Sequence, residues 1–467
     1  MNKAPQHSNK TADSIQQALT AYASEFRYDD LPAEAIHAAK VRVIDTLGCL
    51  IGAFFGEPAR VARALAARLP NPDGATVIGT RMKTMPDMAA FANATTARDS
   101  EMTDSYHYPR SFHGHPSDIV TPVLAVAEHV GASGRDYIAS LILGYEVFLR
   151  FSNAFDNEGF DAANFGVIAN AIAAGKLFRL DQVPLSHCIS MAAVPNVILK
   201  QVRKGHLSMY KSAAAGHAGR AGVFAAQLAR AGMEGPHLPF EGKAGWCEHV
   251  ARKRLRLDLL GGRGEPFKIL DTRLKNRPVE GNAIAPALAA EKVGPLRDID
   301  KVAQITVEVF EHALDRAGRG DHQWNPTTRE TADHSIPYIV AAALMFGRIS
   351  SRSFDEARLW DPRLRGLLPK IRVVENKEFT AAYERLPVEH RCRVTVAMAD
   401  GQRLVGEAGG DADDHAREMS DEKVMEKFRQ FTEDTLGARQ VARILDRLWR
   451  LENVGNVAVI PADFVLA

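Results

Sequence analysis

The sequence predicts a mainly α-helical protein in which a large all-α domain is joined to a smaller α+β domain. Three observations support this fold class. Apolar residues recur at helical spacing almost without interruption through residues 14–193. Three short segments after residue 300 alternate apolar and polar residues, as strands do. Charged amphipathic helix patterns then return over residues 411–451.

The domain boundaries are expected where these patterns change. We predict that residues 1–265 form the N-terminal part of the helical domain and that residues 266–405 form the α+β domain. We predict that residues 406–467 form helices that return to the helical domain. A chain of 467 residues, 46% of them apolar, is long enough to fill cores of this size.

The composition disfavours several classes of partner and cofactor. The 58 lysines and arginines nearly cancel the 57 aspartates and glutamates, so we expect neither nucleic acid nor a membrane surface as a partner. The four cysteines lie far apart and lack the spacing of a zinc site or a disulfide scaffold. The polar N-terminus has no apolar segment of the kind found in secretion signals. The sequence therefore predicts a cytoplasmic protein.

The elements of the first domain follow from apolar spacing, with one exception. The segment at residues 76–80, TVIGT, has the composition of a short strand. The expected helices are nearly uncharged in the middle of the domain, which predicts that they are buried, and their many alanines and glycines permit close packing. They lie at residues 14–27, 33–55, 61–69, 88–96, 119–129, 134–151, 165–178 and 184–193.

The chemistry is concentrated after residue 98, where two acids precede several histidines. Glu101 and Asp104 are three residues apart and would share a face if this part were helical, and His107, His113 and His115 follow on a segment rich in Gly, Pro and Ser. Histidine and a paired carboxylate together suit proton transfer near neutral pH. A solvated surface loop explains the same residues equally well. No second pair of ligands at helical spacing accompanies the histidines, so no metal is expected.

A cluster of cations follows later in the helical domain. Lys211 opens a helix that is otherwise small and apolar, and Arg203, Lys204 and His206 lie just upstream. Lys211 either faces solvent as an ordinary first-turn charge or faces a pocket, and the helix dipole disfavours a cation at this position. Beside the histidines, such a cluster suits a substrate that carries several carboxylates.

The second domain combines strand patterns with one apolar helix. The strands are expected at residues 302–310, 371–375 and 391–398. Between them, His334 and Tyr338 lie four residues apart at the start of the apolar segment and would share a helical face. The sequence contains no internal repeat and none of the common phosphate-binding or nucleophile-elbow motifs.

Several motifs resemble one enzyme family over nearly the whole chain. They are RxxExxD at residues 98–104, GHPSD at 114–118, LGYEV at 143–147, the Lys211 helix with GVFAAQLARAG, FEGKAGW at 240–246 and ETADHSIPYIVA at 330–341. Together they resemble the MmgE/PrpD family, and the ADHSIPY form is similar to its 2-methylcitrate dehydratase branch.

The resemblance implies a fold and a set of site residues. It implies a large helical domain with a smaller α+β lid inserted into it, an active site between the two, no organic cofactor or metal, and a homodimer. The resemblance places the catalytic residues at the following positions: Glu101, Asp104, His115, Lys211, His334 and Tyr338.

Two positions depart from the family pattern. Where relatives have a histidine after the GYEV helix, this chain has Asp161 or Ala162, and where the lid offers a histidine after a Pro-x-Glu motif, it has Asn282. Asp161 and Asn282, which stand at these positions, are assigned to substrate binding. Arg203, from the cation cluster, is assigned to substrate binding as well. The missing imidazoles leave three explanations open: fewer proton-transfer groups suffice, the substrate differs, or activity is lost.

Three functions remain compatible with the sequence. The first is a lyase that dehydrates a hydroxy-polycarboxylate such as 2-methylcitrate, with His115 as base and Arg203 and Lys211 holding carboxylates of the di- or tricarboxylate substrate. The second is an isomerase, epimerase or decarboxylase acting on a related di- or tricarboxylate. The third is a non-catalytic binding protein built on the same fold.

Overall fold

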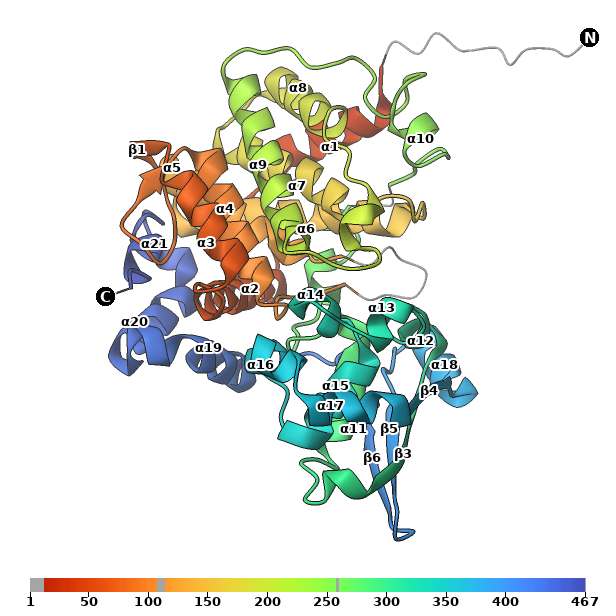
Figure 1. The fold of residues 1–467 in the computed structure, drawn as a ribbon. Helices are drawn as coiled ribbons and strands as arrows, with labels where there is room; N and C mark the ends of the chain where they lie inside the picture. The colour runs from red at the N-terminus through yellow and green to blue at the C-terminus, as the bar shows by residue number, and fades with distance from the viewer. Residues whose placement is uncertain (1–11, 107–113, 258–259, 467) are drawn as a thin grey trace, which may run out of the picture.

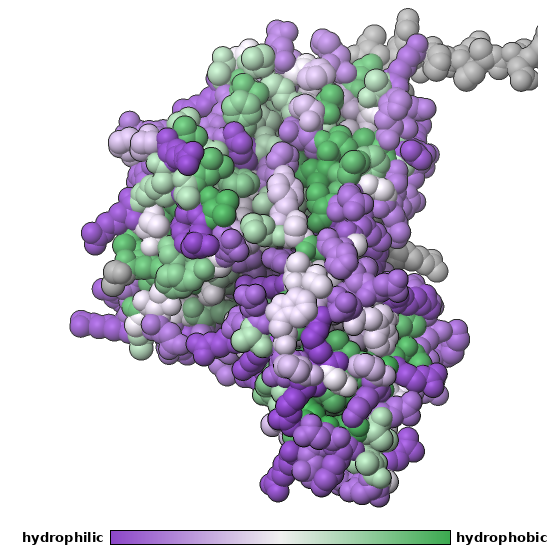
Figure 2. Space-filling model, viewed as in Figure 1, coloured by the Kyte–Doolittle hydropathy of each residue, from purple (hydrophilic) through white to green (hydrophobic). Residues whose placement is uncertain are grey.

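The computed structural model describes residues 12–106, 114–257 and 260–466 and shows a mainly helical protein with small sheets (Figure 1). Buried apolar residues form two large clusters. The first core contains residues from 15 to 274 together with residues from 424 to 464, and the second core contains residues from 279 to 408. Polar and charged side chains cover much of the visible face around these cores (Figure 2). The division at residues 265 and 405 stays a proposal.

The helices of the first core begin at recognisable signals and pack closely. The Asp13 side chain accepts a hydrogen bond from the Gln16 amide, and Ser133 forms a capping box with Asp136. A Cβ at Gly222 would lie 2.6 Å from Asn170, so glycine is needed where α9 meets α7. The helices are α1 (Ser14–Glu25), α2 (Ala33–Gly52), α3 (Glu57–Ala66), α4 (Pro86–Asp99), α5 (Val120–His129), α6 (Gly134–Ala154), α7 (Ala163–Leu177), α8 (Gln182–Ala193), α9 (Tyr210–Arg230) and α10 (Trp246–His249).

The second core contains a four-stranded sheet with the order β4-β3-β5-β6. β3 pairs in parallel with β4 and antiparallel with β5, and β5 forms a hairpin with β6. The strands alternate because one face of the sheet packs on helices α11 (Ile284–Glu291) and α15 (Ile336–Phe346). The strands are β3 (Val302–Val309), β4 (Ile371–Glu375), β5 (Cys392–Met398) and β6 (Arg403–Ala408). The three predicted strands are confirmed, whereas β6 was not predicted.

The C-terminal helices, drawn in blue in Figure 1, lie beside α2 of the N-terminal part. α19 (Asp421–Leu436) packs on α2, where a Cβ at Gly52 would lie 2.3 Å from the Phe431 ring, and α20 (Ala438–Trp449) and α21 (Val459–Asp463) follow. Val424 and Ile444 belong to the first core. The chain thus leaves the first core after residue 274 and rejoins it from residue 424.

Two smaller observations complete the fold. The strand predicted at residues 76–80 lies mostly outside the observed hairpin, because β1 (Pro70–Thr76) ends where it was expected to start and pairs with β2 (Lys83–Thr84). Among the described residues, no helix combines the length and the hydropathy needed to cross a bilayer.

Candidate active site

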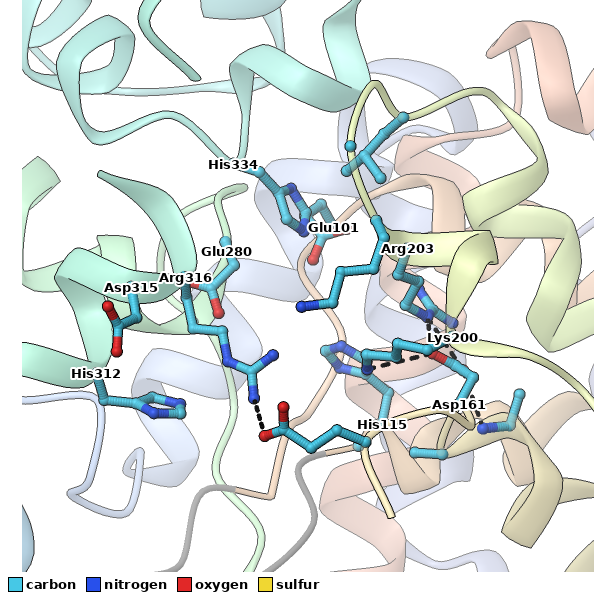
Figure 3. Close-up of a pocket in the computed structure, with 18 of the residues that line it drawn as sticks. Glu101, His115, Asp161, Lys200, Arg203, Glu280, His312, Asp315, Arg316 and His334 are labelled. Carbon is cyan, nitrogen blue, oxygen red and sulfur yellow. Dashed lines mark hydrogen bonds and ion pairs between the residues drawn. The ribbon is translucent and has the colours of Figure 1, made fainter. Parts of the chain in front are cut away.

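A cavity of about 510 Å³ lies between the two cores, and side chains from both line it (Figure 3). From the first core come Arg98, Glu101, His115, Asp118, Asp161 and Arg203. From the second core and the segment that leads into it come Lys275, Glu280, His312, Arg316 and His334. Most of these side chains are charged or titratable, which is typical of an active site rather than of an apolar ligand pocket.

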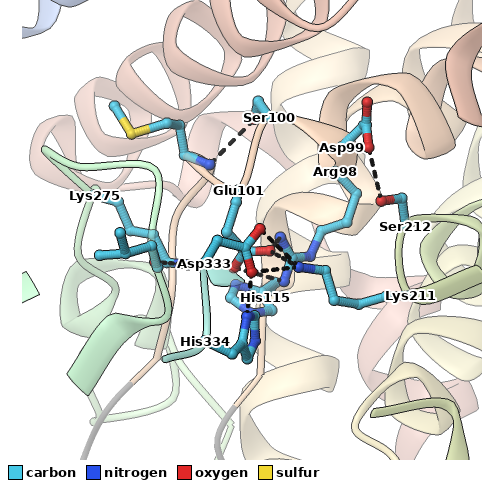
Figure 4. Close-up of polar contacts among 12 residues, drawn as sticks. Arg98, Asp99, Ser100, Glu101, His115, Lys211, Ser212, Lys275, Asp333 and His334 are labelled. Atoms are coloured by element: carbon cyan, nitrogen blue, oxygen red, sulfur yellow. Dashed lines mark hydrogen bonds and ion pairs between the residues drawn. The ribbon is translucent and has the colours of Figure 1, made fainter. Parts of the chain in front are cut away.

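Glu101 lies at the centre of a buried charge cluster (Figure 4). α4 ends at Asp99, and Glu101 adopts a left-handed backbone with φ of 53°. Its carboxylate accepts from Arg98 at 3.0 Å and Lys275 at 2.6 Å, and Lys211 lies 3.1 Å away. Burial alone would raise the pKa of Glu101, but these three cations hold it well below its usual value. Glu101 is therefore ionised and weakly basic.

Lys211 joins Glu101 to the second core. Its ammonium donates to both oxygens of Asp333, at 3.1 and 3.2 Å, and its side chain is only 3% exposed, so it lies behind Glu101 rather than in the cavity wall. Asp333 also contacts Nδ1 of His334, whose ring lines the cavity. The Asp333 carboxylate thus orients His334 so that Nε2 is the nitrogen available to a ligand.

His115 is held as a neutral ring. Its Nδ1 lies 2.8 Å from the carbonyl oxygen of Asp104, which can only accept, so Nδ1 donates and carries the proton. Burial lowers the pKa of His115 well below its usual value, and the positive charges of Arg98, Lys275 and Arg203 lower it further. A neutral ring protonated at Nδ1 presents an unprotonated Nε2, which is the form a general base requires.

The Asp104 side chain supports this histidine from outside the cavity. Its carboxylate accepts from the Ser117 amide at 2.8 Å and from the Tyr145 hydroxyl at 2.9 Å, and it is fully buried. The prediction that Glu101 and Asp104 share a helical face is wrong, because α4 ends before either residue. Asp104 fixes the loop that carries His115, and its carboxylate does not line the cavity.

Asp161 organises the cations on the other side of His115. Its carboxylate accepts from Nε of Arg203 at 3.1 and 3.2 Å and from Lys200 at 3.4 Å, and it is 1% exposed. Burial would raise the pKa of Asp161, but Arg203 and Lys200 lower it overall. Asp161 therefore holds two cations in the cavity wall.

Comparison with known proteins places the chain in a family. The MmgE/PrpD N-terminal domain matches residues 17–257, and the MmgE/PrpD C-terminal domain matches residues 278–451. The chain belongs to the MmgE/PrpD family.

Its relatives cover almost the full length of the chain at modest identity. A 2-methylcitrate dehydratase of Salmonella typhimurium is 27% identical over 90% of both chains. A 2-methylcitrate dehydratase of Cupriavidus necator is 27% identical over 81% of both chains. A cis-aconitate decarboxylase of Homo sapiens is 23% identical over 96% of this chain and 94% of its own. These similarities support an enzyme of the lyase type.

Besides Asp104 and Lys211, two further predicted site residues, Tyr338 and Asn282, do not line the cavity. The Tyr338 hydroxyl donates to the Ser353 carbonyl at 2.7 Å inside the second core, and the ring is fully buried. His334 and Tyr338 do not share a helical face, because His334 precedes Ser335, the N-cap of α15. Asn282 donates its amide to Glu280 at 2.7 Å and is itself absent from the cavity wall.

Not all predicted residues fall within the described part of the chain. His107 and His113 lie outside the described residues. Within those that are described, no group of three or more His, Cys, Asp or Glu side chains has an arrangement that could hold a metal ion.

Among the residues that sequence reasoning missed and the structure brings to the cavity, three bear on the chemistry described above. Lys275 is fully buried and donates to Glu101 and to the Val279 carbonyl. Asp118 lies inside the GHPSD motif, which was a signal for it, and burial raises its pKa to about 7. Glu280 belongs to the Pro-x-Glu sequence before Asn282. A charged residue outside a periodic apolar pattern carries no signal of burial, which explains why Lys275 and Glu280 were overlooked.

Proposed function

We propose that this protein is a cofactor-independent lyase that removes water from a hydroxy di- or tricarboxylate such as 2-methylcitrate. One observation carries the proposal: the neutral His115 ring, protonated at Nδ1, shares a cavity wall with Arg98, Arg203 and Lys275. A base surrounded by cations suits proton abstraction beside a carboxylate, where negative charge develops on the substrate.

The proposed reaction uses groups from both sides of the cavity. Nε2 of His115 takes the proton from the carbon next to a carboxylate, and that carboxylate accepts the electron pair as an aci-carboxylate. Arg203 and Lys275 stabilise the developing charge. The electron pair then forms the double bond while the hydroxyl leaves with the Nε2 proton of His334. In this step His334 reacts as an imidazolium, whose Nδ1–H donates to Asp333, and becomes neutral. The products are an enoate and water.

Decarboxylation is the second candidate, because one group of relatives consists of cis-aconitate decarboxylases. An epimerase shares the first step and returns the proton to the opposite face. The three reactions differ in product: dehydration creates a conjugated double bond, decarboxylation releases carbon dioxide, and epimerisation changes only the optical rotation.

The experiment is a spectrophotometric assay with 2-methylcitrate and with malate. An increase in absorbance in the enoate band, which does not occur with the His115→Gln variant, would support dehydration. Carbon dioxide release from cis-aconitate without water loss from either hydroxy acid would favour the decarboxylase. Stabilisation of the fold by these ligands without any turnover would leave only a binding protein.

A further inference from the structure

The charges on the cavity wall are already balanced. Among the described residues, seven carboxylates and six lysines or arginines line the cavity. Five of the six cations are already ion-paired with Glu101, Asp161 or Glu158. The wall therefore offers no surplus of positive charge, and each further carboxylate on a ligand must compete with one that is already bound.

Glu280 differs from most of the other acids of the described wall and shares its lack of an ion pair with Asp118 alone. It forms no ion pair with any described residue, and its side chain lies on the same side of the cavity as His312, Asp315 and Arg316 (Figure 3). Its two oxygens accept from the Asn282 amide N–H at 2.8 Å and from Asn282 Nδ2 at 2.7 Å. An ionised carboxylate has about four acceptor positions, so about two remain available.

Asn282 holds this carboxylate in place. It is 1% exposed, and its backbone N–H and its side-chain Nδ2 each donate one hydrogen bond to Glu280. Its own Oδ1 has no hydrogen-bond partner among the described residues. Asn282 therefore fixes an acceptor on the cavity wall. A carboxylate fixed in this way attracts a donor and repels another anion.

We propose that Glu280 is a specificity-determining residue that accepts a hydrogen bond from a hydroxyl or ammonium group of the substrate, and that the cavity takes two substrate carboxylates rather than three. The inference rests on the proposed function and narrows its substrate class to dicarboxylates such as malate, which excludes the tricarboxylate 2-methylcitrate. A dicarboxylate would meet the cations around His115 with its carboxylates and Glu280 with its donor. A third carboxylate would meet the negative charge of Glu280, which forms no ion pair with a described residue.

The test is calorimetric titration with four probes: succinate, which has no donor, malate, which has a hydroxyl, aspartate, which has an ammonium, and tricarballylate, which has a third carboxylate. Malate or aspartate should bind wild type at least tenfold more tightly than succinate, because a hydrogen bond to a charged group contributes about ten- to hundredfold in affinity. Tricarballylate should bind more weakly than succinate. Whichever of malate and aspartate binds more tightly identifies the donor.

In Glu280→Gln, whichever of malate and aspartate binds wild type more tightly should bind about as tightly as succinate does. Tricarballylate should bind this variant more tightly than it binds wild type. Rotation of the Asn282 amide turns its free Oδ1 toward the new glutamine amide, so the local fold can be kept. Asp156→Asn is the matched control, because it removes the same charge from the cavity rim at a carboxylate that already pairs with Lys253. In this control, the affinities of malate, aspartate and tricarballylate relative to succinate should be the same as in wild type.

Several outcomes would overturn the inference. Equal binding of succinate, malate and aspartate by wild type, tightest binding of tricarballylate, or no binding of any probe would each do so, without any variant being needed. Unchanged ratios in a folded Glu280→Gln protein would also overturn it. The affinity ratios and the release of water are separate measurements, so failure to release water from malate while the affinity ratios hold would count against the proposed function alone.

Discussion

Replacing Asp118 by asparagine should stabilise the protein at alkaline pH. Asp118 lies in the 3-10 turn η2 (Pro116–Ile119) directly after His115, is only 7% exposed, and lines the cavity. Burial raises the pKa of its carboxyl from 3.8 to about 7, although Arg98 and Arg203 lower it. The folded protein therefore resists ionisation of this group, whereas the unfolded chain does not.

The size of the stability difference follows from the shift in the pKa of Asp118. One pKa unit corresponds to about 1.4 kcal/mol, so ionised Asp118 makes the folded state about 4 kcal/mol less stable than a carboxyl with an ordinary pKa would. Because the folded-state pKa is raised, the stabilising contribution is fully present below about pH 4 and is lost as pH rises through about 7. Asparagine resembles the protonated carboxyl, so the advantage of the variant should grow by about 2–3 kcal/mol between about pH 5 and about pH 8.

Urea unfolding of both proteins at several pH values would measure this difference. Other carboxylates titrate alike in the two proteins and cancel in the comparison. Asp156→Asn, at an exposed aspartate paired with Lys253, controls for the loss of one negative charge. If the free energy of unfolding of Asp118→Asn exceeded that of wild type by the same amount across this pH range, the reasoning would be refuted. It would also be refuted if this excess became smaller as the pH rises.

The remaining predictions concern the base, the buried lysine and the absence of a metal. His115→Gln should lower turnover by about two to four powers of ten while circular dichroism stays unchanged; turnover at the wild-type rate would exclude His115 as the base. Lys211→Met should lower the free energy of unfolding by about 3 kcal/mol, because it strands the buried Asp333 carboxylate, and Lys211→Arg should lower it less; equal urea midpoints for all three proteins would contradict this. Chelators should leave turnover unchanged in steady-state assays, since Nδ1 of His115 is bound to a backbone carbonyl; loss of activity that zinc or magnesium restores would disprove this.

Much of the fold could be predicted because its elements have regular apolar patterns. Strands β3, β4 and β5 alternate over five residues or more, and the burial of β5 follows that alternation. β6 was missed because it is an edge strand with a glycine, Gly406, in its interior, which weakens the pattern. Periodicity thus predicts elements that bury one face and misses those at the edge of a sheet.

The site was harder to predict because backbone geometry decides which side chains meet. His115 and His334 reach one cavity, as motif resemblance led us to expect, but the separation of Glu101 from Asp104 depends on where α4 ends. Tyr338 belongs to α15, which begins at Ile336, two residues after His334, and its hydroxyl points into the second core. Residue spacing cannot show such local breaks in a helix.

The left-handed backbone of Glu101 shows how the two cores are joined at the site. A non-glycine residue in this conformation costs about 1–3 kcal/mol and persists only where its surroundings hold it. Arg98 and Lys211 hold the carboxylate from the first core, and Lys275 holds it from the segment that leads into the second. Lys211 also binds Asp333, so a shift of either core would strain the same cluster. Glu101 is therefore better suited to fixing the cations around His115 than to moving a proton itself, which leaves the neutral imidazole as the base of the proposed reaction.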